Sequence, residues 1–176
     1  LDVYGSMSLP ATNMSWSPAS GITLTFRGTS SYTITTNGNT LNTTSLTLDA
    51  VGGTLTLGSA LALNSTRSLT ITNGTFSTSA SNYSLSCGTL SSSNSNTRTI
   101  SLNASAVTLT GTTVINFATS TNLTFNAGTS TLSVGGNTIA FAGGGMTFYN
   151  VTFTGTTAAV KTITGANTLT VTYYKR

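Results

Sequence analysis

Apolar and polar residues alternate over short segments throughout the chain, and one such phrase returns at nearly regular intervals. The phrase has the form apolar–polar–apolar–polar, and its first and third residues are hydrophobic at every occurrence. Alternation with a period of two predicts a β-strand with one face buried. We expect the following inward pairs in successive coils of one fold: Leu1/Val3, Ile22/Leu24, Leu46/Leu48, Leu69/Ile71, Ile100/Leu102, Leu123/Phe125, Met146/Phe148 and Leu169/Val171.

The spacing of the phrases predicts the architecture. The last four begin at Ile100, Leu123, Met146 and Leu169, so three successive intervals are 23 residues each. Further alternating runs follow within each interval, with Gly or Asn at the joins. This pattern favours a parallel β-helix, because one coil cannot bury its apolar side alone and must stack on its neighbours. An antiparallel sandwich or barrel also uses many short strands, but it requires no constant period.

We therefore predict an all-β fold, a parallel β-solenoid of about eight coils with three short strands in each. At about 4.8 Å per coil, the rod would be about 40 Å long. Residues 1–176 would form a single domain. The interval from Leu69 to Ile100 is longer than the others and contains the polar run "SSSNSNT". This run predicts a loop insertion near 91–97.

A second pattern places Ser and Thr at alternate positions of the strand that follows each phrase. Stacked coils would align these side chains into two ranks of hydroxyls on one face, similar to the flat threonine arrays of ice-binding β-solenoids. Thr also favours outward strand positions in general, which explains the pattern without a ligand. The candidate threonine face comprises Thr33, Thr35, Thr54, Thr56, Thr75, Thr108, Thr110, Thr131, Thr152 and Thr154.

The two ends of the repeat are also candidates for function. The first phrase starts at residue 1, and the last phrase is still in phase near residue 176. An uncapped terminal coil presents an unpaired strand edge. We therefore expect either a segment of a longer solenoid or head-to-tail pairing between copies, which propagates into a filament. The candidate assembly residues are Leu1, Val3, Leu169, Val171 and Tyr173.

Composition argues against catalysis and against nucleic acid as a partner. The chain has no His, and its two acidic residues are Asp2 and Asp49, so the usual general bases are scarce. The net charge is +4, but the six basic residues are scattered rather than clustered into a stripe. We expect no enzyme, no cofactor and no metal site. The acids of coils one and three would lie on the surface.

The remaining sequence features concern the thiol and the environment of the protein. Cys87 stands alone, so it forms no internal disulfide, and its alternation with Tyr83 and Leu85 predicts a buried position. No apolar run approaches the length of a membrane span. The abundance of Thr, Ser, Asn and Gly with few charges is typical of secreted or virion-surface proteins, so we expect an extracellular location.

Segments such as "FYNVTFTG", "KTITGANTLTV" and "LTFRGTSSYTITTNGNTL" resemble the Thr/Asn/Gly-rich β-helix repeats of tailed-phage fibre and appendage proteins and of secreted bacterial adhesin passengers. The resemblance implies a structural rod or adhesin of a cell or virion surface. We expect the chain itself to be its main partner, and surface glycans or ice are further candidate partners. Two alternatives stay open, namely an ice-binding solenoid and a polysaccharide-binding or polysaccharide-cleaving β-helix.

Overall fold

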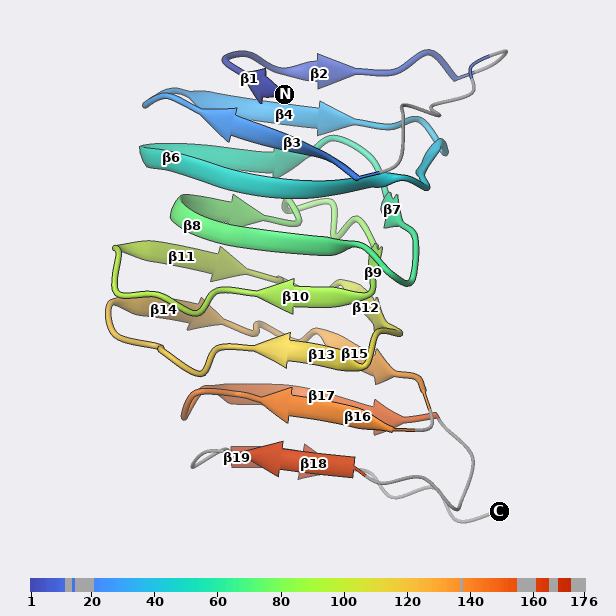
Figure 1. Ribbon diagram of the computed structural model, residues 1–176, viewed down its shortest axis with the longest axis vertical. Coiled ribbons are helices and arrows are strands. Elements are labelled where there is room, and N and C mark those ends of the chain that lie inside the picture. The colour runs from blue at the N-terminus through green and yellow to red at the C-terminus, as the bar shows by residue number, and fades with distance from the viewer. Residues whose placement is uncertain (12–13, 15–20, 137, 155–160, 165–167, 172–176) are drawn as a thin grey trace.

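The computed structural model is a stack of coils in which all recorded strand pairings are parallel (Figure 1). It describes residues 1–11, 14, 21–136, 138–154, 161–164 and 168–171. These residues form strands β1 to β19 and no helix. The predicted all-β parallel β-solenoid is confirmed.

The strands lie on three faces. The first face contains β1 (Asp2–Val3), β3 (Ile22–Arg27), the first parts of β6 (Thr44–Leu57) and β8 (Ser68–Ser77), β10 (Thr89–Ser91), β13 (Thr113–Asn116), β16 (Ile139–Ala142) and β18 (Lys161–Thr164). The second contains β2 (Met7–Ser8), β4 (Ser31–Thr35), the last parts of β6 and β8, β11 (Arg98–Ser101) and β14 (Leu123–Asn126). The third contains β5 (Thr40–Leu41), β7 (Leu61–Leu63), β9 (Leu85–Cys87), β12 (Ala106–Leu109), β15 (Thr131–Val134), β17 (Thr147–Phe153) and β19 (Thr168–Val171).

The described residues complete about six turns, slightly fewer than the eight coils expected. The first coil contributes β1 and β2, and the last contributes β18 and β19, so neither has a third strand among the described residues. In Figure 1 the chain descends from the first coil at the top to the last at the bottom.

The core is a set of apolar columns that run through the stack. On the first face each strand from β3 to β16 places a buried side chain directly above the next, because parallel pairing in register repeats the same position. The column is Leu24, Leu46, Leu69, Leu90, Ile115 and Phe141. A slip of one residue would turn every one of these side chains to solvent.

The structure corrects the register expected from the repeated phrase. In the second coil Leu24 and Phe26, not Ile22 and Leu24, pair with Leu46 and Leu48. At Ile100 and Leu123 the phrase lies on the second face, where Ile100 pairs with Phe76 above and Phe125 below. The phrases at Met146 and Leu169 fall in β17 and β19. Leu69 instead pairs with Leu90, 21 residues later. Every coil contains several alternating phrases, so their spacing alone does not say which face a phrase occupies. The long interval is therefore where the phrase changes face.

The corner between the first and second faces changes along the stack. In the third and fourth coils it is so tight that β6 and β8 continue through it. Gly74 occupies this corner with a φ of 86°, and a Cβ there would overlap the carbonyl oxygen of Ala50. In the fifth coil the same corner is the segment 92–97, within the region where a loop was expected.

A buried arginine fills the wider corner of the fifth coil. Arg98 is 1% exposed and pairs in register with Gly74 above and Leu123 below. Its guanidinium donates to Ser92 Oγ (2.8 Å) and to four backbone carbonyl oxygens, those of Ser92, Asn96, Thr119 and Thr121. Burial lowers the pKa of Arg98. The side chain thus satisfies carbonyl groups of two successive corners.

Asparagine side chains link consecutive coils at the corners. Their Nδ2 groups donate to backbone carbonyls of the preceding coil: Asn37 to Leu9 (2.6 Å), Asn96 to Thr72 (3.1 Å), Asn103 to Ser79 (3.2 Å) and Asn122 to Ser95 (2.9 Å). Asn37, Asn103 and Asn122 also adopt positive φ, which Asn tolerates better than most residues. Asn37, Asn103 and Asn122 therefore each have two roles: the backbone forms the turn, and the side chain bonds to the preceding coil.

Candidate functional site

The first coil leaves one strand edge without a neighbour among the described residues. β1 pairs with β3, and β2 pairs with β4. The terminal amine of Leu1 donates to Thr23 O (2.9 Å), and Leu1 O accepts from Thr25 N (2.9 Å). Alternate residues of a parallel strand direct their backbone groups to opposite edges. The N–H and C=O of Asp2 therefore face the open edge.

The same argument applies to the second strand of this coil. Leu9 N donates to Thr35 O (2.9 Å), so the backbone of Ser8 faces the opposite, open edge. Two strands of the first coil thus present backbone donors and acceptors in the direction of the rod axis. Such an edge is the template on which another parallel strand can add.

The residues expected at the assembly ends are placed as follows. Leu1 is 72% exposed, and Val3 is half-buried against the core. Leu169 and Val171 lie in β19, which pairs with β17. Tyr173 lies outside the described residues. Among the five expected assembly residues, the surroundings of the side chains are therefore described for Leu1 and Val3 of the first coil.

The ten residues of the candidate threonine face lie on two faces of the solenoid. Thr33, Thr35, Thr54, Thr56 and Thr75 belong to the second face. Thr108, Thr110, Thr131, Thr152 and Thr154 lie on or beside the strands of the third face. The face changes between these sets because the repeated phrase itself moves by one face after Leu69.

The second face nevertheless carries two continuous ranks of small polar side chains. Each rank follows from the parallel register of β4, β6, β8, β11 and β14. No charged residue occupies either rank. The first rank is Ser31, Thr54, Thr75, Thr99 and Thr124, and the second is Thr33, Thr56, Ser77, Ser101 and Asn126. We name these two ranks the hydroxyl face.

Hydroxyl side chains are not confined to that face. On the first face, outward-facing Thr25, Thr47, Thr70 and Ser91 are also aligned in register. This distribution fits the general preference of Thr for outward strand positions. The feature that distinguishes the hydroxyl face is that both of its ranks run through five coils.

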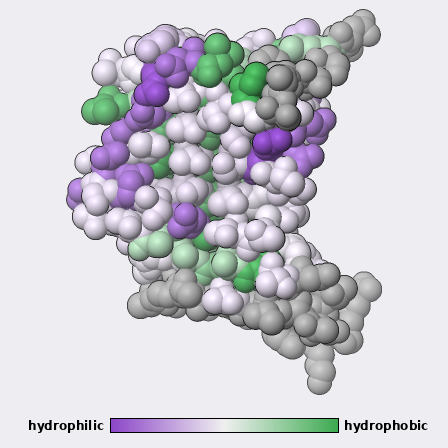
Figure 2. Space-filling view, in the orientation of Figure 1, coloured by the Kyte–Doolittle hydropathy of each residue, from purple (hydrophilic) through white to green (hydrophobic). Residues whose placement is uncertain are grey.

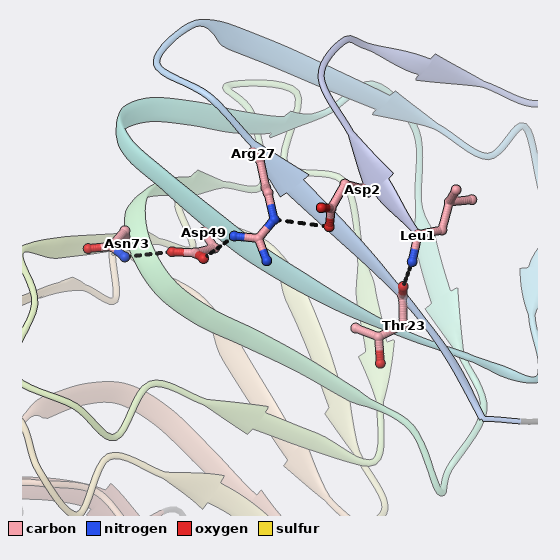
Figure 3. A network of polar contacts seen from close by, with 6 residues as sticks. All are labelled: Leu1, Asp2, Thr23, Arg27, Asp49 and Asn73. Atoms are coloured by element: carbon pink, nitrogen blue, oxygen red, sulfur yellow. Dashed lines mark hydrogen bonds and ion pairs between the residues drawn. The ribbon is translucent and has the colours of Figure 1, made fainter.

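A polar network crosses the first four coils at the end of the first face. Arg27 lies between the two acids, with Nε 2.9 Å from Asp2 Oδ1 and Nη1 2.5 Å from Asp49 Oδ2. Asn73 Nδ2 donates to Asp49 Oδ1 at 2.6 Å (Figure 3). The hydrogen bond and charge of Asp2, followed by those of Asp49, raise the pKa of Arg27. Asp2 and Asp49 are thus held by one guanidinium.

The sequence alone predicts Asp2 and Asp49 as separate surface acids and does not point to Arg27 as their partner. The available signal was the sequence distance, since Arg27 and Asp49 are separated by nearly one coil. Their pairing becomes certain only from the register, in which Arg27 pairs directly with Asp49.

The other candidate groups contribute little chemistry. Cys87 is buried, and burial raises the pKa of its thiol to about 12, so the nucleophilic thiolate is scarce at neutral pH. Within the described residues, no three His, Cys, Asp or Glu side chains gather in a way that could hold a metal ion. The same residues include no helix long and apolar enough to cross a membrane.

No family model, curated protein or solved structure matches this chain. The function is therefore inferred from the geometry of the coils, their edges and their surfaces.

Proposed function

We propose that this protein is a structural segment of an extracellular or virion fibre or adhesin, and that copies assemble head to tail through their end coils. The observation that carries the proposal is the edge of the first coil that no strand of the described residues covers. There the backbone groups of Asp2 and Ser8 face along the rod axis, while the strands behind them continue the register of the stack.

The second copy is the partner that fits this edge best. Its end coil would offer parallel strands of the same three-faced cross-section, so apolar columns and backbone pairing would continue across the junction. The first coil also has apolar surface to cover, since Leu1 is 72% exposed and Val3 and Met7 are only partly buried. Low charge and abundant Thr, Ser and Asn support an extracellular location.

The replacement Ser8→Pro should prevent assembly without unfolding the protein. Proline removes the N–H that faces the open edge, while the bonds of Leu9 and Met7 to β4 are kept. We expect wild-type protein to form filaments that lengthen with concentration, with an axial repeat of about 40 Å from the eight strands stacked along the first face. The Ser8→Pro protein should stay as single rods in negative-stain electron microscopy and analytical ultracentrifugation.

Ser8→Ala is the matched control, because it keeps the N–H and changes only an exposed side chain. It should assemble as the wild type does. Wild-type rods that remain monodisperse over the whole concentration series, or Ser8→Pro filaments like those of Ser8→Ala, would contradict the proposal.

Ice binding is a second candidate function, favoured by the two continuous ranks of the hydroxyl face. If this face binds ice, Thr75→Tyr should abolish thermal hysteresis, because a ring at the centre of the ranks prevents close contact with a flat surface. Thr108→Tyr places the same ring on an exposed position of the third face and should leave the hysteresis unchanged. Absence of hysteresis in the wild type, or equal loss in both variants, would exclude this function.

A further inference from the structure

A groove follows the long edge of the molecule where the first face turns into the second. In Figure 2 hydrophilic residues gather along this edge. One depression of about 400 Å³ is lined by Tyr4, Arg27, Gly28, Thr29, Asp49 and Val51. A second, of about 230 Å³, begins at Val51 and continues past Asn73 and Gly74 to residues 96–99. We name the two together the corner groove.

The corner groove contains two of the four large hydrophobic side chains that are exposed among the described residues. Tyr4 is 70% exposed and Val51 is 67% exposed, while the other two, Leu1 and Tyr149, do not line it. Exposed apolar groups that converge on one concave site, with polar groups between them, are typical of ligand binding. The floor lies close to the backbone, because Gly28, Gly52 and Gly74 line it without side chains.

The polar groups in the corner groove are held in fixed positions. Asp49 accepts from both Arg27 and Asn73, so the guanidinium, carboxylate and amide groups lie in a row across three coils (Figure 3). Groups that are already ordered lose little conformational entropy when a ligand binds. Each carboxylate oxygen of Asp49 accepts one hydrogen bond and has a second lone pair, which a sugar hydroxyl group can use.

The charges in the corner groove disfavour an anionic ligand. Arg27 is shared by the carboxylates of Asp2 and Asp49, so its positive charge is more than offset and the three groups together carry one negative charge. The guanidinium of Arg98, at the far end of the groove, is buried and donates to the chain itself. A phosphate or sulfate group would meet a carboxylate without a free cation, which disfavours anionic ligands.

We propose that the corner groove binds a neutral oligosaccharide, with a sugar ring lying against Tyr4 and hydroxyl groups bonded to Arg27 and Asp49. An extended peptide fits this groove less well. Such a peptide binds by pairing its backbone with an exposed strand edge. The corner groove offers side-chain amide and carboxylate groups instead. The proposal goes beyond head-to-tail assembly and does not depend on it.

The test is isothermal titration of the protein with cellohexaose, laminarihexaose, maltohexaose and mannohexaose. A sulfated oligosaccharide and an unstructured polar peptide serve as comparison ligands. We expect at least one neutral hexasaccharide to bind, and Tyr4→Ala to weaken its binding by about tenfold or more, since exposed aromatic anchors dominate such sites. Tyr149→Ala, which removes a 55% exposed ring outside the groove, should leave the affinity unchanged.

The proposal is overturned if no neutral hexasaccharide binds, if the sulfated ligand or the peptide binds more tightly, or if Tyr4→Ala and Tyr149→Ala have equal effects. Titrations are run on both the wild type and Ser8→Pro. The filament experiment alone tests the assembly proposal, and the titrations alone test the saccharide site, so the two proposals can fail independently. Binding by monodisperse wild-type rods would overturn the assembly proposal and support the site.

Discussion

Replacement of Arg98 by alanine is expected to lower the free energy of unfolding by about 3–5 kcal/mol, because several buried acceptors lose their donor together. The guanidinium donates to four carbonyl oxygens and to Ser92 Oγ, and these acceptors come from the corners of two successive coils. Chemical denaturation measures the loss. Hydrogen exchange should accelerate most in β10, β11 and β14, since coils contact only their neighbours.

Two further variants separate the role of the guanidinium from that of a buried charge. Arg98→Lys keeps the charge but offers three donors in place of a planar fork of five, so it should remain strongly destabilised. Arg67→Ala should change the free energy of unfolding by less than about 1 kcal/mol. Arg67 Nε is buried without a hydrogen-bond partner, so removing it leaves no acceptor of Nε unpaired. Equal effects of Arg98→Ala and Arg67→Ala would contradict the assigned role of Arg98.

A second large effect is expected in the aromatic cluster near the C-terminal end of the stack. Phe148 is buried, and its ring centroid lies 4.9 Å from that of Phe125, 5.0 Å from that of Phe141 and 6.4 Å from that of Phe117. Phe148→Ala should cost about 3–5 kcal/mol, because the lost transfer energy is joined by the cost of the cavity. The midpoint of urea denaturation measures the change.

Tyr149→Ala is the matched control for the cluster. It removes an aromatic ring from the adjacent residue of the same strand, but this ring is 55% exposed. Its effect should stay within about 0.5 kcal/mol, as for most surface substitutions. A loss in Phe148→Ala no larger than in Tyr149→Ala would mean that the cluster does not stabilise the end of the solenoid.

The sequence predicts the fold class well because the fold depends on a simple pattern. Alternation fixes which residues face inward, and the return of the phrase fixes a stack of similar coils. Cys87 follows the same rule and is buried beside Leu85, as its alternation predicts. Alternation is a property of one strand, so it predicts the inward residues of that strand even where the strand is assigned to the wrong face.

The face occupied by each phrase could not be predicted in the same way. The outward hydroxyls of Thr56 and Thr108 follow equivalent phrases, yet they lie on different faces. The fourth coil takes only 21 residues from Leu69 to the next column position at Leu90, so the phrase at Ile100 falls on the following face. The role of Arg98 was also hidden. A charged residue in a strand ordinarily predicts an outward position, and only the widened corner supplies enough carbonyl acceptors to bury it.

The corner asparagines give the stack a direction of growth. Each of Asn37, Asn96, Asn103 and Asn122 donates to a carbonyl of the coil that precedes it in the chain. A coil added after existing ones therefore finds its acceptors already in place, whereas a coil formed before its predecessor keeps these amides unpaired. During synthesis the N-terminal coil leaves the ribosome first. The coils are therefore made in the same order in which each can bond to the coil before it. The two ends of the described stack are consequently inequivalent, so copies that assemble head to tail as proposed would form a polar filament.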